Sequence, residues 1–211
     1  GITVPFDPTT AQMTFVTMDY AGVAGTVTRT PASVNVAQSI AYFTVPQGAA
    51  TGDATVFGLV GTTKTDFADG DFLLQIVPVV TDAQITSVSG GNMNVTLTGF
   101  GFIEANNSEY RFGTEVVTDV SASTGPDVNT SYPGYIPNGT VTLSVPLTDA
   151  AFGAIVVKTA GGASAAFSLN LTGIAGTAFS GTPANLALPS ANSGQAVTLL
   201  GTNLSTATDV V

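Results

Sequence analysis

The hydrophobic pattern of the chain is that of short β-strands separated by turns. Apolar or β-branched residues alternate with polar ones in short runs, and Gly, Pro, Asn or Asp bounds most of these runs. Val141-Thr142-Leu143-Ser144-Val145 shows the alternation most clearly, because its Val, Leu and Val side chains fall on one face of a strand. Strand signals that recur every 8–12 residues or so are typical of sandwiches and barrels. The pattern predicts an all-β fold of antiparallel strands with essentially no helix.

Local sequence also predicts where the chain turns. Asp69-Gly70 and Asn138-Gly139 suit the positive-φ positions of tight hairpin turns, and Gly161-Gly162 suits a turn in the same way. Strands are expected at residues 11–18, 25–30, 39–45, 55–60, 72–80, 84–88, 92–98, 110–112, 115–120, 140–145, 154–159 and 164–171. The last seven fall within roughly 90 residues, which suits an immunoglobulin-like sandwich.

Two sequence patterns occur twice along the chain with nearly the same spacing. Residues 45–52 resemble residues 145–153, and their prolines are 100 positions apart. Residues 95–99 resemble residues 197–201, and their glycines are 102 positions apart. A period near 100 residues predicts tandem modules. We expect a partial module at residues 1–81 that lacks its opening strands, a complete module at 82–173, and the opening strands of a third, incomplete module at 174–211.

The motifs of the middle module resemble those of the IPT/TIG family. They are Ile85-Thr86-Ser87-Val88, residues 95–102, Tyr110-Arg111-Phe112-Gly113, and the segment from Val145-Pro146 to Gly153. The resemblance implies tandem immunoglobulin-like β-sandwiches, as in repeats of microbial cell-surface or filament proteins. Members of the family include adhesins, receptors, transcription-factor domains and accessory domains of carbohydrate enzymes, so the resemblance implies a fold more strongly than a function.

Charge narrows the range of partners. The chain has 4 Lys or Arg and 14 Asp or Glu, which gives a net charge of −10. This charge repels phosphate backbones, so nucleic acid is not an expected partner, and the apolar runs are too short for membrane insertion. Charged residues make up 9% of the chain, against about 25% in average proteins. Either neighbouring subunits cover much of the surface, or uncharged Thr, Ser and Asn solvate it.

The residue inventory argues against an enzyme. The chain has no Cys and no His, which excludes cysteine nucleophiles, Ser-His-Asp triads and zinc bound by His or Cys. Glu104 and Glu109 are the only clustered Glu residues, and they flank a polar loop without a platform for a sugar ring. No catalytic residue is therefore expected, and the absence of Cys fits an exported protein.

Three weaker site hypotheses remain. Asp66, Asp69 and Asp71 are candidate ligands for calcium, the only cofactor considered, if a turn brings their carboxylates together. Tyr132 and Tyr135 belong to an apolar, Pro-constrained loop that is a candidate contact surface for a partner.

Asn106 and Asn129 lie in Asn-x-Ser/Thr triplets within expected loops, so they are the candidate glycosylation sites. For each site, the alternative is an ordinary solvated or packed loop.

Two functions are compatible with these features. The first is a structural segment or subunit of an extracellular filament, stalk or surface layer, whose partners are copies of itself or adjacent modules of the same chain. Strands of one copy would then complete the next, unless the chain is part of a longer protein. The alternative is an adhesin or carbohydrate-binding module of a larger secreted protein, with surface glycans as ligands. Both place the chain outside the cell or on its surface.

Overall fold

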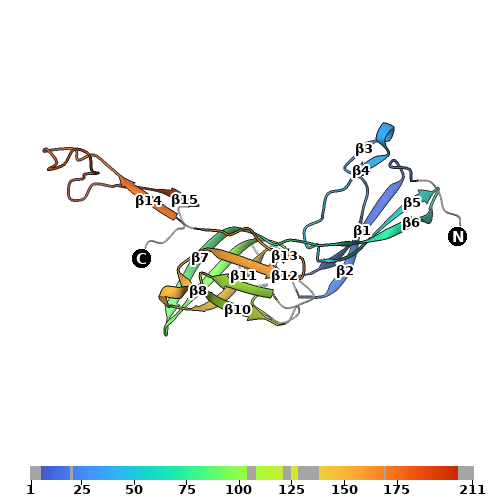
Figure 1. Cartoon of the computed structure of the whole chain (residues 1–211), viewed down its shortest axis with the longest axis horizontal. Coiled ribbons are helices and arrows are strands. Elements are labelled where there is room, and N and C mark those ends of the chain that lie inside the picture. The colour runs from blue at the N-terminus through green and yellow to red at the C-terminus, as the bar shows by residue number, and fades with distance from the viewer. Residues whose placement is uncertain are drawn as a thin grey trace. The chain divides into compact units, whose positions relative to one another are not determined.

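The computed structural model consists mainly of antiparallel β-strands, as Figure 1 shows. It describes residues 6–19, 21–103, 108–120, 125–127, 138–168 and 170–203, with the backbone alone at 66–70 and 170–172. Within these ranges the helical elements are two three-residue 3-10 turns, η1 (Val36–Gln38) and η2 (Asp149–Ala151). The predicted all-β fold is therefore confirmed. The chain divides into two compact units, residues 1–166 and 167–211.

The first unit begins with a four-stranded antiparallel sheet of order β2-β1-β5-β6. Phe15 in the centre of its second strand is 1% exposed, whereas Leu73 at its edge is 68% exposed. Gly61, with a φ of 63°, turns the chain between the last two strands. A separate two-stranded sheet, β3-β4, comes between β2 and β5 in the sequence. The strands are β1 (Ala11–Met18), β2 (Ala24–Arg29), β3 (Ser33–Asn35), β4 (Ile40–Tyr42), β5 (Gly52–Val60) and β6 (Thr63–Leu74).

The rest of the first unit is a β-sandwich-like pair of sheets, of orders β11-β8-β7 and β10-β9-β12-β13. The alternation at 141–145 is borne out, because Val141, Leu143 and Val145 are all buried while Ser144 is exposed. Buried apolar side chains of both sheets form the core, among them Leu97, Leu143, Tyr110, Phe112 and Val157. The strands are β7 (Val79–Ser89), β8 (Asn92–Phe100), β9 (Ser108–Phe112), β10 (Glu115–Asp119), β11 (Thr140–Pro146), β12 (Ile155–Thr159) and β13 (Gly162–Ala163).

The two four-stranded sheets have the same topology. In each, two strands form a hairpin, the chain leaves for a strand outside the sheet, and it returns beside the first strand of the hairpin before the last strand is added. The order β2-β1-β5-β6 thus repeats as β10-β9-β12-β13, with β4 and β11 as the strands outside. The repeat that the sequence predicts at a period of 100 residues is therefore also a repeat of sheet topology.

The described part of the second unit contains one antiparallel strand pair, and this pair repeats the pairing of β7 with β8. β7 has a bulge next to its pairing with Gly99, and the first strand of the second unit has a bulge next to its pairing with Gly201. Two residues beyond each glycine, Gly101 and Asn203 have positive φ angles of 73° and 58°. The strands of this pair are β14 (Asn170–Ala175) and β15 (Thr198–Thr202).

Three expected strands differ from the structure. The run predicted at 72–80 is divided between β6 and β7, because the Ile76 amide donates to Thr51 Oγ1 at 2.9 Å and Pro78 has no N–H for a ladder. The run predicted at 164–171 is not one strand, since β13 ends at Ala163 and β14 begins at Asn170. The strand predicted at 39–45 is limited to β4, residues 40–42.

The turn and boundary predictions have different outcomes. Asn138 does adopt a positive φ of 62°, whereas Asp69-Gly70 is not a turn, because the backbone of β6 continues through it. The expected boundaries at 81/82 and 173/174 lie inside β7 and β14, and the compact units divide at 166/167. The division into three modules stays a prediction.

Asn138 connects the first sheet of unit 1 to the sandwich. Its Nδ2 donates to the Ala49 carbonyl at 2.7 Å, its Oδ1 accepts from the Ile103 amide, and the residue is 2% exposed. Ile103 in turn packs with Met18 and Ala50 in one buried apolar cluster. Both polar ends of a buried amide are thus used to join segments 89 and 35 residues away in sequence.

Replacing Asn138 is expected to weaken this connection. Asn138→Ala leaves the Ala49 carbonyl and the Ile103 amide buried without their partner. It also places alanine, whose side chain cannot form a local hydrogen bond, at a positive φ. We expect the free energy of unfolding to fall by about 2–4 kcal/mol, measured by urea denaturation. Asn138→Gly, which tolerates the backbone conformation, is the matched variant and should lose less. A change within about 0.5 kcal/mol for Asn138→Ala would contradict this role.

Candidate functional site

The strand pair β14-β15 exposes apolar side chains that its counterpart in the sandwich buries. Val197 and Leu199 correspond to Val95 and Leu97 through the repeat of 102 residues. Val95 and Leu97 are 3% and 0% exposed, whereas Val197 and Leu199 are 47% and 39% exposed. The same local sequence therefore forms core in one copy and open surface in the other.

Among the described strands, β15 also has an edge without a partner. β8 lies between β7 and β11, so both of its edges are paired. β15 pairs with β14 alone among the described strands. A two-stranded pair is marginally stable in water without a third strand or a covering layer. An unpaired edge beside exposed apolar side chains is therefore a template for the addition of a strand.

The loop between β14 and β15 is held by side-chain amides. Gln195 Nε2 donates to the Thr177 carbonyl at 2.6 Å, and its Oε1 accepts from the amides of Phe179 and Asn192 at 3.2 and 3.1 Å. Asn192 binds the backbone of Ser180 through both ends of its own amide. These bonds fix a loop on which the Phe179 side chain is 87% exposed, which extends the apolar surface of β14-β15.

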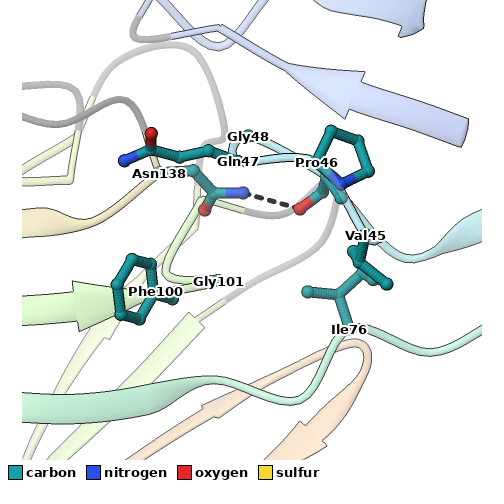
Figure 2. A pocket seen from close by; sticks show the side chains of 9 residues that line it. Val45, Pro46, Gln47, Gly48, Ile76, Phe100, Gly101 and Asn138 are labelled. Atoms are coloured by element: carbon teal, nitrogen blue, oxygen red, sulfur yellow. Dashed lines mark hydrogen bonds between the residues drawn. The ribbon is translucent and has the colours of Figure 1, made fainter. Parts of the chain in front are cut away.

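A pocket of about 320 Å³ lies at the connection within unit 1. Figure 2 shows Asn138 directed toward the loop of Pro46 and Gly48, with Phe100 and Ile76 on other sides of the pocket. The Asn138 amide is already bound to Ala49 and Ile103, and none of the described lining residues has an ionisable side chain. A ligand there would find mainly apolar atoms and backbone.

Asp119 and Asp127 form a buried acid pair in the sandwich. They are 7% and 1% exposed, and Tyr110 Oη donates to Asp127 Oδ2 at 3.2 Å. Burial, followed by the hydrogen bond and the charge of Asp119, raises the pKa of Asp127 to about 8. Burial likewise raises the pKa of Tyr110. Asp127 therefore carries a proton at neutral pH, and the pair fits a structural role inside the sandwich.

The carboxylates considered from the sequence are placed as follows. Residues 66–71 lie within β6, at a shift in its register with β5 between Asp66 and Asp71. The Asp71 side chain is exposed, and the side chains of Asp66 and Asp69 lie outside the described part of the structure, so the calcium hypothesis stays a prediction. No cluster of three potential metal ligands occurs among the side chains that the structure describes. Glu109 forms an ion pair with Arg111 at 2.8 Å, which lowers its pKa.

Four other candidates lie outside the described residues: Tyr132, Tyr135, Asn106 and Asn129. The partner-contact and glycosylation hypotheses attached to them stay predictions. The sequence did not reveal the amide connection of Asn138, because its two partners are distant in the chain. It did contain the signal for β14-β15, namely the repeat at residues 197–201.

Comparisons with known proteins add no relative. No protein family, curated protein or solved structure matches the chain significantly. The IPT/TIG resemblance therefore stays a prediction. Helices long and apolar enough to cross a membrane do not occur in the described part of the chain.

The acid pair predicts a pH dependence of stability. The pKa of Asp127 is about 8 in the folded protein and 3.8 for an ordinary, solvated Asp, as in the unfolded chain. Between these values the folded state holds a proton that the unfolded state has lost, so stability decreases as pH rises. We expect this group to contribute a slope of up to about −1.4 kcal/mol per pH unit between pH 5 and 8.

Urea denaturation across this pH range measures the slope, and Asp127→Asn should flatten it relative to the wild type. Asp53→Asn removes a carboxylate from an exposed position of β5 and is the matched control. Equal slopes for wild type and Asp127→Asn would show that the pair does not titrate in this way.

Proposed function

We propose that the chain is a structural segment or subunit of an extracellular filament, stalk or surface layer, and that it assembles by strand complementation between β-sheets. The observation that carries the proposal is the contrast between Leu97 and Leu199. Equivalent residues in a repeated strand pair are 0% exposed in one copy and 39% exposed in the other. A partner that covers β14-β15 would bury the second copy as the sandwich buries the first.

The low content of charged residues supports an assembled state over a free monomer. Soluble monomers usually have about 25–35% charged residues on their surface, whereas this chain has 9% charged residues overall and a mean hydropathy of +0.40. Exposed apolar residues occur on both units, including Phe72 and Leu73 at the edge of the first sheet. Repeated subunit contacts would cover such surfaces.

The proposal assigns the protein a mechanical role and no catalytic residue, cofactor or metal. Its partners are other copies of the chain or adjacent modules. The extracellular location is part of the proposal.

Sedimentation velocity over a range of concentrations tests the proposal, with electron microscopy of the largest species. The wild type should form oligomers or fibres. Val197→Asp/Leu199→Asp should shift the population to monomers at least tenfold, because it places charges where the partner must exclude water. Val88→Asp/Val116→Asp introduces the same charges at exposed sandwich positions and should assemble normally. A wild type that remains monomeric throughout would contradict the proposal.

A further inference from the structure

We infer that β15 of one copy is added to the edge of β4 in a second copy, the edge that no described strand pairs with, so that Thr198 lies opposite Tyr42. This inference rests on the proposed function and names the partner and the register of the contact. Its template is the pairing of β8 with β11 inside the sandwich.

The first step is the correspondence between β4 and β11. Each comes between the second and third strands of a four-stranded sheet with the same topology, β2-β1-β5-β6 or β10-β9-β12-β13. Each also leads into a Val-Pro segment, at Pro46 or Pro146, and the prolines are 100 residues apart. Through this spacing of 100 residues, β4 at residues 40–42 is equivalent to the first residues of β11, which begins at Thr140.

The second step is the direction of the backbone groups. In β11, the Thr142 amide donates to the Pro126 carbonyl at 3.3 Å, away from β8. In β4, the Tyr42 carbonyl accepts from the Ala32 amide at 2.7 Å, on the side of β3. The backbone groups of Thr142 therefore point away from the edge of β11 that pairs with β8, and those of Tyr42 point away from the corresponding edge of β4. The alternate residues Ala41 and Phe43 present their backbone groups to that edge, as antiparallel geometry requires.

The third step is the register. β11 pairs with β8 so that Thr142 lies opposite Thr96, with their hydroxyls 3.0 Å apart. Moving β11 back by 100 residues and β8 forward by 102 places Tyr42 opposite Thr198.

Through the same shift, the buried apolar pairs of the template correspond to pairs that are also apolar. Val141 opposite Leu97 becomes Ala41 opposite Leu199, and Leu143 opposite Val95 becomes Phe43 opposite Val197. The chain thus contains both halves of a pairing whose inward positions remain apolar. Residues 43–45, which the sequence predicts as strand and the structure leaves outside β4, would then gain a ladder partner.

The fourth step is the choice of a second copy over the same chain. The proposed function requires contacts that repeat from copy to copy, and β15 and β4 would supply the two halves of one such contact. Pairing within one chain would use both edges and leave no contact for assembly.

Disulfide formation between two singly substituted chains tests the pairing, because the protein has no Cys of its own. Tyr42→Cys and Thr198→Cys are purified separately, mixed and oxidised, and the linked dimer is measured by non-reducing electrophoresis. The template pair is a non-hydrogen-bonded pair, whose Cα separation of about 4.5 Å suits a disulfide. We expect at least fivefold more dimer than from either variant oxidised alone.

Register is tested by two further mixtures. In the proposed register Leu200 lies opposite Ile40, two residues from Tyr42. Tyr42→Cys with Leu200→Cys should therefore give several-fold less dimer. Ile40→Cys with Leu200→Cys is in register again and should restore it.

Each outcome is decisive when sedimentation velocity is run on the same samples. Assembly without preferential in-register dimer overturns the inference and leaves the proposed function in place. No assembly overturns both. A chain that carries Tyr42→Cys and Thr198→Cys together, and that closes a disulfide within itself without dimer, shows that β15 pairs with its own β4 and also overturns the inference.

Discussion

A pair of β-strands with an apolar face needs further strands or a covering layer to bury that face, and this constraint applies to both units of the chain. β8 meets it, because β7 and β11 pair with its edges and the core covers Val95 and Leu97. β15 has the same sequence pattern and the same bulged neighbour, yet its corresponding side chains are exposed. The described part of the chain thus contains one covered and one uncovered version of the same strand pair, and the proposed assembly would cover the second.

The first sheet and the sandwich of the first unit are joined by several kinds of contact. The first sheet is fixed to the sandwich through the Asn138 amide and the cluster of Met18, Ala50 and Ile103. Close backbone contact strengthens the connection, since a Cβ on Gly161 would lie 2.0 Å from the Ile76 carbonyl oxygen. These contacts hold the first sheet and the sandwich together as parts of one unit.

The sequence predicts those elements whose stability is local. The strands at 11–18 and 140–145 were located because alternation and bounding turns are visible within a few residues. The break between β6 and β7 was missed, since it depends on Thr51, 25 residues from the Ile76 amide that it binds. The exposure of the side chains on β15 could not be predicted, because residues 95–99 and 197–201 have similar sequences. Only the strands that surround β8 place its side chains in a core.

The central claim is that β15 of one copy and the β4 edge of another become one sheet. Hydrogen–deuterium exchange, compared between assembled and dilute monomeric protein, measures this directly because new ladder bonds protect amides. The account predicts slower exchange on assembly at residues 41–45 and 196–200 together, with little change in the sandwich core. Assembly that leaves both segments exchanging at their monomer rates would contradict it.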